Sequence, residues 1–257
     1  MVRQNTVREV ITDDGVVLGA RASSFSPALV EIYGDIGLDF VWLDFEHSGF
    51  SPWDADKITH LQRAAELSGI QLLIRLPDED PALIRKVLDT GVRNLLIPRI
   101  ETAAEVRRAA EATRFVYEGR PGNRGMAGQR ASGYGTTEGY AQREDDTVNL
   151  GAMIETEEAV DNISDILDVP ELGFAFVGSN DLATQLGHPN ESDHLEVTAA
   201  IETVEAASRS AGVPLGAVAH AVDDANRKIS NGYQILRIGG EFESAKRTLM
   251  DRMAQIE

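Results

Sequence analysis

The stretch that decides the fold is residues 40–50, which read Phe-Val-Trp-Leu-Asp-Phe-Glu-His-Ser-Gly-Phe. Its first four residues are apolar and β-prone without alternation, which is typical of a short strand buried on both faces of a parallel sheet. The run stops at Asp44, Glu46 and His47, and ligands bind at the carboxyl ends of strands in parallel α/β folds. The stretch therefore indicates a strand that delivers an acid and an imidazole to a catalytic edge. The structural alternative is a loop hydrogen bond from Asp44 and a helix cap at His47.

The same rhythm recurs along the chain, where short β-rich runs alternate with amphipathic helical stretches and no low-complexity linker divides them. Helix ends are marked by Ser26 before Pro27 and by Gly69 after Ser68. Eight strands with intervening helices predict one (β/α)8 TIM barrel over residues 1–257. An open doubly wound sheet is the alternative, but no Gly-x-Gly-x-x-Gly motif follows the first strand. The expected strands are Val16–Ala22, Phe40–Asp44, Gln71–Arg75, Asn94–Pro98, Gly151–Glu155, Phe174–Gly178, Leu215–Ala219 and Ile235–Gly239, and the expected helices are Pro27–Tyr33, Asp54–Ser68, Pro81–Asp89, Ala103–Ala112, Glu157–Ile166, Leu195–Ala211 and Asp223–Ser230.

Composition limits the cellular setting. The chain has no cysteine, so it offers no disulfide and no thiolate metal site, which suits a cytoplasmic protein. The segment from Met1 to Asp14 is polar and carries acids, and no apolar run approaches the roughly eighteen residues that a membrane span needs. We expect a cytoplasmic protein that is neither secreted nor inserted in a membrane.

The charge balance is strongly acidic, with a formal net charge of −18 and a pI near 4.6. This argues against nucleic acid as a partner, because phosphates require a basic surface. Four of the 24 basic residues are lysines (Lys57, Lys86, Lys228 and Lys246), which leaves twenty arginines. An acid excess with scarce lysine favours a halophilic protein from a high-salt cytoplasm, where self-repulsion is screened. The alternative is an ordinary acidic enzyme.

Two segments stand apart from the strand–helix rhythm. Residues 117–149 are rich in glycine and arginine, and we expect a long loop there that acts as a lid or a subunit contact. Phosphate binding is a weaker alternative, because no Gly-Lys-Ser/Thr ending follows the glycines. At the other end, a helix over about 242–256 is expected to pack either on a neighbouring subunit or on its own barrel.

Charged residues also end three further strands. Arg75 ends an apolar run, where a guanidinium is costly unless it is paired or meets an anion, so it suggests an oxyanion clamp. Glu155 and Asp181 follow two successive strands and are expected on the same rim. Two carboxylates without cysteine or a nearby histidine favour a hard octahedral ion, Mg²⁺ or Mn²⁺, over structural zinc. Taken singly, Glu155 and Asp181 could instead cap the helices that follow them.

With these residues in place, the chain resembles the HpcH/HpaI aldolases of the aldolase/citrate lyase superfamily, which are metal-dependent class II pyruvate aldolases. The resemblance covers nearly the whole chain, and the Asp-x-Glu-His and Gly-x-x-Asp-Leu elements in this order are its most specific parts. It rests on Ser26-Pro27 leading into Glu31, Gly37-Leu38-Asp39-Phe40, Asp44-Phe45-Glu46-His47, Ile74-Arg75, Leu96-Ile97-Pro98, Arg124-Gly125, Ile154-Glu155-Thr156 and Gly178-Ser179-Asn180-Asp181-Leu182.

The resemblance implies a role for each matching residue. Glu155 and Asp181 would hold a divalent metal, Mg²⁺ or Mn²⁺ with Co²⁺ as a further candidate. His47 would be the base, oriented by Asp44, and Arg75 would steady the enolate oxygen. Gly178, Ser179 and Asn180 would bind the carboxylate of the 2-oxo acid, chiefly through the backbone amides of Ser179 and Asn180. A homohexamer that exchanges C-terminal helices is also implied.

The chain departs from the family pattern at two places. Residues 115–118 read Phe-Val-Tyr-Glu where many members have Tyr-Pro-Pro, and residues 18–21 read Leu-Gly-Ala-Arg where many have a tryptophan. Both places shape the pocket around the aldehyde. The departures therefore leave the identity of the aldehyde undetermined, whereas the expectation of pyruvate as the 2-oxo acid is unaffected.

We therefore expect a carbon–carbon lyase that reversibly cleaves a 4-hydroxy-2-oxo acid to pyruvate, or a related 2-oxo acid, and an aldehyde. His47 would move the proton, and the metal and Arg75 would stabilise the enolate. A Schiff-base aldolase needs a lysine at a strand end, and all four lysines fall in helical stretches. Oxaloacetate decarboxylation, a CoA-ester lyase of the same superfamily and a non-catalytic barrel scaffold remain as alternatives.

Overall fold

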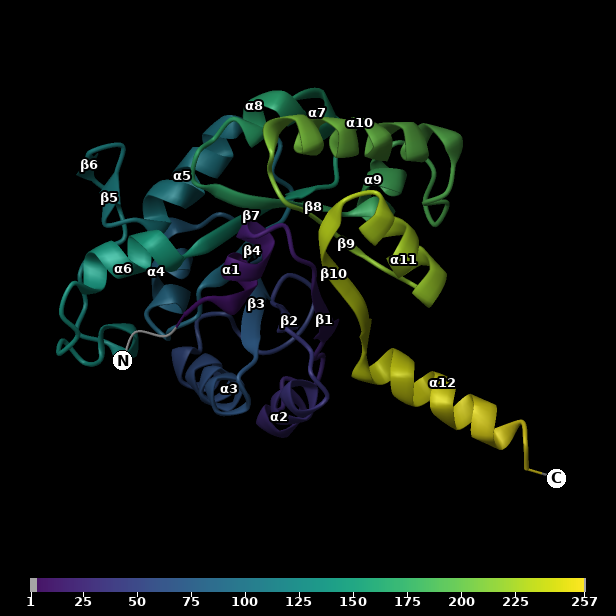
Figure 1. Cartoon of the computed structure of the whole chain (residues 1–257), viewed down its shortest axis with the longest axis horizontal. Coiled ribbons are helices and arrows are strands. Elements are labelled where there is room, and N and C mark those ends of the chain that lie inside the picture. Colours follow the sequence, from purple (N-terminus) through teal and green to yellow (C-terminus); the bar gives the residue numbers. More distant parts are fainter. Residues whose placement is uncertain (1–3, 257) are drawn as a thin grey trace.

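The computed structural model describes residues 4–256, which form a closed barrel of eight parallel strands (Figure 1). Around the barrel the strand order is β1-β10-β9-β8-β7-β4-β3-β2. The prediction of a single-domain (β/α)8 barrel is confirmed, and the open sheet is excluded by the pairing of β1 with both β2 and β10. The barrel strands are β1 Val17–Arg21, β2 Phe40–Asp44, β3 Gln71–Arg75, β4 Asn94–Ile97, β7 Asn149–Ile154, β8 Leu172–Val177, β9 Leu215–Val218 and β10 Tyr233–Gly240.

Helices surround the strands and follow the expected order, with ends that shift by a few residues. The stretch expected as one helix over Glu157–Ile166 is two short helices, because Asn162 leaves helical geometry and donates from its side chain to the Glu101 carbonyl at 3.0 Å. The helices are α1 Thr6–Thr12, α2 Pro27–Asp35, α3 Ala55–Ser68, α4 Pro81–Leu88, α5 Ala103–Thr113, α6 Tyr140–Thr147, α7 Glu157–Asp161, α8 Ile163–Leu167, α9 Ser179–Gln185, α10 Leu195–Ala211, α11 Val222–Ser230 and α12 Glu241–Met253.

The core has an inner and an outer layer, separated by the strands. Successive side chains of a strand point to opposite faces. In β2, Phe40 and Trp42 therefore fill the barrel interior, while Val41 and Leu43 pack outward against the helices. All five β2 residues are buried, which confirms that residues 40–44 form a strand covered on both sides. Helix α1, which the sequence did not predict, contributes Val7 to the interior cluster and closes the amino end of the barrel.

The segment 117–149 is more ordered than the expected loop. It contains the hairpin strand β6 Arg120–Pro121, which pairs with β5 Val116–Tyr117, a 3₁₀ turn at Arg130–Ser132, and α6. Its arginines are paired with acids: Arg124 Nη2 lies 2.7 Å from Glu144 Oε2, and Arg130 pairs with Glu66. The Arg124 pair lies within the segment, and the Arg130 pair joins the segment to α3. Both guanidinium groups are therefore already paired, which argues against the phosphate alternative.

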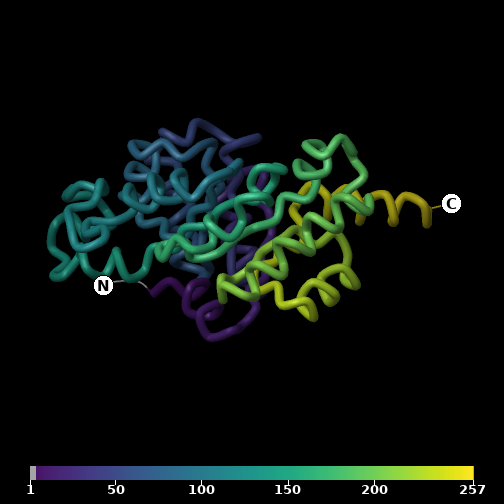
Figure 2. Tube along the Cα trace, turned by 90° about the horizontal axis from the view of Figure 1, so that it is seen from above, coloured from purple at the N-terminus to yellow at the C-terminus, as the bar shows by residue number. Residues whose placement is uncertain are grey.

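Helix α12 projects away from the barrel in both views (Figures 1 and 2). All of its residues lie within the described range, and none of them is buried. Phe242, Leu249, Met250 and Met253 are between 57% and 70% exposed, which is unusual for large apolar side chains on one helix. Within residues 4–256, no helix combines the length and apolar character needed to cross a lipid bilayer.

Candidate active site

The carboxyl end of the barrel holds a cavity of about 140 Å³. Side chains alternate between the inside and the outside of the barrel along each strand. The last inward-facing side chain of a strand can therefore line this cavity, which we call the mouth. The polar and aromatic groups that line it are Arg21, Trp42, Asp44, Arg75, Ser179, Asn180, Asp181, His220 and Arg237, together with Met153 and Gly178.

Asp44 and Arg75 form a buried, two-pronged ion pair at the ends of β2 and β3. Arg75 Nε donates to Asp44 Oδ1 at 3.0 Å and Arg75 Nη2 donates to Asp44 Oδ2 at 2.7 Å. Burial alone would raise the pKa of Asp44, but the hydrogen bonds and charge of Arg75 outweigh it and lower that pKa. For the same reason the pKa of Arg75 is raised despite its burial. The pair is charged at neutral pH, and it holds the guanidinium in one orientation.

The imidazole of His47 is oriented differently from the expectation. Asp44 Oδ1 accepts from the backbone N–H groups of Glu46 and His47, at 3.2 and 3.3 Å, so it shapes the turn. The His47 ring is 61% exposed, and its Nε2 lies 3.6 Å from Glu46 Oε2. Glu46 also pairs with Arg75 Nη1 at 2.7 Å. The carboxylate beside the imidazole is therefore that of Glu46, and Asp44 acts on the main chain of His47.

Asp181 lines the mouth, and Glu155 is buried directly beside the lining residue Gly178. Glu155 is 2% exposed, Oε1 accepts from the Arg99 backbone N–H at 2.8 Å, and Oε2 has no hydrogen-bond partner among the described residues. Burial, together with the charges of Asp181 and Glu46, raises the pKa of Glu155 to about 7, although the Arg99 N–H opposes the shift. A buried carboxylate with one empty oxygen is costly unless a cation or a proton meets it.

Gly178 makes room for that carboxylate. A Cβ at this position would lie 2.5 Å from Glu155 Oε2 and 2.7 Å from Glu155 Cβ, so any larger residue would displace Glu155. The chain then enters α9, whose first turn carries Ser179, Asn180 and the exposed Asp181. The first N–H groups of a helix have no partner within the helix, so the amides of this turn are available to an anion in the cavity.

The donor set of Glu155 and Asp181 fits a hard divalent cation. Glu155 Oε2 is buried and empty, Asp181 is near enough to raise the pKa of Glu155, and both donors are carboxylate oxygens. Oxygen donors of this kind suit Mg²⁺ or Mn²⁺. Glu155 and Asp181 could therefore hold such an ion, with the remaining positions left to water and ligand oxygens.

Sequence reasoning missed five of these lining residues: Arg21, Trp42, Met153, His220 and Arg237. The Trp42 ring lies 5.8 Å from the Arg75 guanidinium and 5.9 Å from that of Arg237, so it forms the floor between two cations. Arg237 interrupts the apolar run of β10, which is the same signal that singled out Arg75. Arg21 was noted only as a departure from the tryptophan of related chains.

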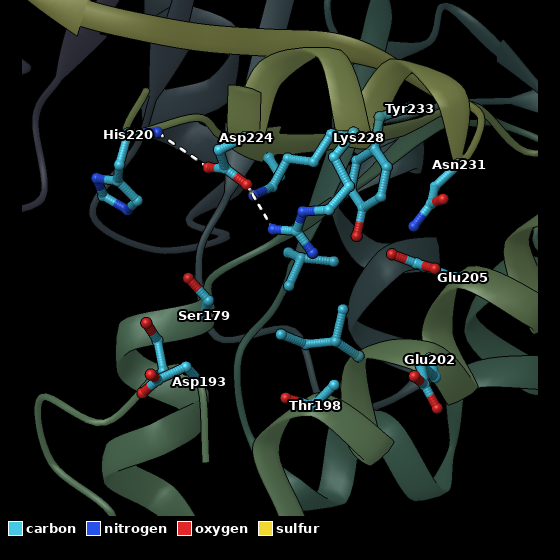
Figure 3. Close-up of a pocket in the computed structure, with 15 residues that line it drawn as sticks. Ser179, Asp193, Thr198, Glu202, Glu205, His220, Asp224, Lys228, Asn231 and Tyr233 are labelled. Atoms are coloured by element: carbon cyan, nitrogen blue, oxygen red, sulfur yellow. Dashed lines mark hydrogen bonds and ion pairs between the residues drawn. The ribbon is translucent and has the colours of Figure 1, made fainter. Parts of the chain in front are cut away.

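A second, larger cavity of about 390 Å³ lies between α10 and α11 (Figure 3). It shares Ser179 and His220 with the mouth. The half-buried carboxylate of Asp224 pairs with Arg227 at 2.6 Å and with Lys228. Partial burial would raise its pKa, but hydrogen bonds from Lys228, the His220 backbone N–H and Arg227 lower that pKa to about 2. The other acids of this cavity, Asp193, Glu202 and Glu205, leave it acidic, whereas the smaller cavity combines arginine side chains with Asp44 and Asp181.

The fold and the mouth together define a TIM-barrel protein with a paired arginine clamp facing two carboxylates. The chain belongs to the HpcH/HpaI aldolase/citrate lyase family, whose model matches residues 19–247. It is 32% identical to a 2-keto-3-deoxy-L-rhamnonate aldolase of Shigella sonnei, over 98% of this chain and 93% of the relative. It is 30% identical to a 5-keto-4-deoxy-D-glucarate aldolase of Klebsiella pneumoniae, over 96% of each chain.

A crystal structure of a family protein from Burkholderia cenocepacia superposes with a TM-score of 0.92 at 29% identity, over 98% of this chain and 99% of that one. These similarities confirm the predicted family and the prediction of a carbon–carbon lyase. The protein is therefore a carbon–carbon lyase of the aldolase type.

Proposed function

We propose that this protein catalyses the reversible aldol cleavage of a 4-hydroxy-2-oxo acid to pyruvate, or a related 2-oxo acid, and an aldehyde. The observation that carries the proposal is the division of the mouth into two halves. On one side, Glu155 Oε2 is buried without a hydrogen-bond partner among residues 4–256, and on the other the Asp44–Arg75 pair presents a fixed guanidinium. A 2-oxo acid fits between them, because its oxygens suit a cation and its developing enolate suits an arginine.

Glu155 and Asp181 would hold the metal, with Mg²⁺ or Mn²⁺ as the first candidates and Co²⁺ as the third. When bound, the ion would polarise the carbonyl of the 2-oxo acid and acidify the neighbouring C–H. Gly178 keeps the space beside Glu155 open, and the amides of Ser179 and Asn180 would bind the carboxylate of the 2-oxo acid.

Arg75 would stabilise the charge that develops on the C2 oxygen. An arginine has five N–H donors, and those directed at Asp44 and Glu46 leave one on Nη2, while the second N–H of Nη1 meets only the Met153 sulfur at 3.7 Å. Because the salt bridges fix the plane of the guanidinium before substrate arrives, little reorganisation is needed when the enolate forms.

His47 would move the proton. In the direction of addition, its imidazole removes a proton from C3 of the 2-oxo acid, and the C–H electron pair forms the enolate. The enolate carbon then bonds to the aldehyde carbon, and the imidazolium returns its proton to the new alkoxide. Glu46, 3.6 Å from Nε2, would stabilise the imidazolium in between. Cleavage is the exact reverse.

The test is a reaction screen of the purified protein with pyruvate against a panel of aldehydes, before and after exhaustive EDTA treatment. We expect new C–C bond formation that EDTA abolishes and that Mg²⁺, Mn²⁺ or Co²⁺ restores. Full turnover without metal, together with borohydride trapping of pyruvate on a lysine, would contradict the proposal. Rapid CO₂ release from oxaloacetate with no aldehyde addition would instead favour a decarboxylase, which uses the same enolate.

We also propose that the chain assembles into a homo-oligomer, with a hexamer as the expected size. The support comes from α12, whose large apolar side chains such as Phe242 and Met253 are exposed on a helix that buries none of its described residues. An equivalent helix of a second copy is the partner that would cover them. Light scattering on the full chain and on a Phe242→Ser, Met253→Ser variant tests this, because only the variant should dissociate.

A further inference from the structure

Two arginines of the barrel mouth have no role in the chemistry proposed above. Arg21 ends β1, and Arg237 lies on the neighbouring strand β10, paired in register with Gly19. Gly19 and Arg21 share one face of β1 because side chains alternate along a strand. Both arginines therefore reach the cavity that Asp44 and Arg75 also line.

The guanidinium groups of these arginines are incompletely paired. Arg21 Nη2 lies 3.3 Å from Asp44 Oδ2 and donates to Ser48 Oγ at 3.1 Å. The guanidinium of Arg237 forms no hydrogen bond or ion pair with residues 4–256, and it lies over the Trp42 ring. The Nε atoms of Arg21 and Arg237 are both buried without an acceptor.

A buried cation without an anion is costly, and the surroundings of Arg237 show that cost. Burial, and then the positive charge of Arg21, lower the pKa of Arg237. The negative charge of Glu243 opposes that shift without cancelling it, and the carboxylates of Asp44 and Glu46 already pair with Arg21 and Arg75. An arginine fork binds a carboxylate or another oxyanion through two parallel hydrogen bonds.

The two arginines lie across the barrel from Glu155 and Asp181. In the closed order β1-β10-β9-β8-β7-β4-β3-β2, β1 is four strands from β7 in either direction, so Arg21 stands opposite the end of β7 that carries Glu155. A ligand whose 2-oxo acid end meets Glu155 and Asp181 would extend its other end toward Arg21 and Arg237.

We propose that Arg21 and Arg237 form a second anion subsite, which selects substrates that carry a negatively charged group at the end remote from the 2-oxo acid. The preferred aldehyde partner is accordingly one that bears an oxyanion, with a carboxylate as the simplest case. This inference rests on the proposed aldolase function, because that function fixes which end of the ligand meets Glu155.

The experiment compares two five-carbon ligands that differ only in their far end. The first, 2-oxoglutarate, ends in a carboxylate, and the second, 2-oxopentanoate, ends in a methyl group. Binding of each is measured by calorimetry on the Mg²⁺-loaded protein at fixed salt. We expect 2-oxoglutarate to bind about 10- to 100-fold more tightly, which is the usual gain from a charge-assisted hydrogen bond.

Two variants assign that preference. Arg237→Met keeps much of the side-chain length without the charge and should reduce the preference to about threefold or less, whereas Arg237→Lys should retain part of it. Arg107→Met, which removes an exposed arginine of α5, is the matched control and should keep the full preference. The ratio of kcat/KM for 4-oxobutanoate over butanal, with pyruvate as the second substrate, should fall in parallel.

Equal affinity of the wild-type protein for the two ligands would overturn the subsite without any variant. An unchanged preference in Arg237→Met would overturn it as well. Failure of the aldolase proposal looks different, because neither 2-oxo acid would then show metal-dependent binding. If both ligands bind only with metal and with no preference, the aldolase proposal stands and the second anion subsite is wrong.

Discussion

Inside the barrel, the polar groups of the two ends are satisfied in opposite ways. At the amino end, Asn94 accepts from Asn5 at 2.9 Å and from Asn149 at 3.3 Å, and donates to the Leu72 carbonyl at 3.2 Å. These groups are neutral, and of this set only the Asn149 Oδ1 atom is left without a partner among the described residues. At the carboxyl end the groups are charged.

Among the described residues, the buried atoms of that charged end without a hydrogen-bond partner include Glu155 Oε2, Arg21 Nε and Arg237 Nε. A neutral, paired network stabilises the fold, whereas buried charges without partners are retained only where a ligand can supply them. The comparison therefore separates a stabilising end from a binding end, and the following predictions test that separation.

The largest effects are expected at the mouth. His47→Ala should lower turnover by about 10²–10⁴-fold, the usual contribution of a general base, while metal affinity stays near that of the wild type. Proton exchange at C3 of pyruvate, followed by NMR in D₂O, measures this step without an aldehyde. Near-normal exchange would remove His47 from the mechanism.

Arg75→Ala should lower turnover about 10²–10³-fold through lost stabilisation of the oxyanion. It should also destabilise the fold, by about 3–5 kcal/mol, because it leaves the buried Asp44 carboxylate without its counter-charge. Arg75→Lys keeps the charge but loses the two-pronged geometry, so it should recover stability more than activity. Equal recovery of both quantities would count against a role for the planar guanidinium.

Metal affinity should depend on pH through Glu155. Its pKa is raised to about 7, so below that pH a proton competes with the metal, and the Kd for Mn²⁺ should rise by about tenfold per pH unit between pH 6.5 and 5.

In the metal-free protein, Glu155 should change the free energy of unfolding with pH in the direction opposite to that of an ordinary ion-paired acid. The folded pKa lies above the unfolded value of 4.5, so this group lowers stability as pH rises from 4.5 through 7.

Glu155→Gln is the control for both parts of this prediction. The variant should bind metal weakly, and its metal affinity should depend less on pH. The difference in unfolding free energy between the wild type and the variant, measured across pH, should give the contribution of Glu155 alone. A wild-type metal affinity that is flat from pH 5 to 8 would show that Glu155 is not a ligand.

The amino end should respond in the opposite way. Asn94→Ala removes the acceptor for two amide donors and should destabilise the protein by about 1–3 kcal/mol, while kcat/KM of the folded protein stays within about twofold. Urea unfolding gives the first quantity and steady-state kinetics the second. A large loss of activity in the folded variant would show that the two ends are coupled.

The last prediction concerns the dependence of stability and assembly on salt, to which many acidic residues each contribute a small amount. With a formal charge of −18, carboxylate repulsion should oppose compaction when the screening length is about 30 Å at 0.01 M salt, and much less when it is about 3 Å at 1 M. We expect the melting temperature and oligomer size to rise steeply between these limits, with KCl as effective as NaCl. A midpoint that moves by only a few degrees would favour an ordinary acidic enzyme over a halophilic one.

The local segments were readable from the sequence because each depends on nearby residues. The unalternated run of residues 40–43 predicted β2, and the same argument from burial at a strand end found Arg75. Errors arose where a single side chain changes the backbone, as at Asn162, or where a short helix lacks a strong periodic pattern, as in α6 and α9.

The sequence by itself determined the strand–helix alternation, the parallel barrel and the acids and arginine at the strand ends, because these follow from local propensity and from the period of apolar residues. Only the tertiary structure decided which charges meet. It paired His47 with Glu46 while Asp44 binds Arg75, left Glu155 Oε2 empty, and brought Arg21 beside Arg237 across more than two hundred residues of chain. Barrel closure sets these neighbours, because it joins the first strand to the last, and spacing along the chain carries no record of that contact.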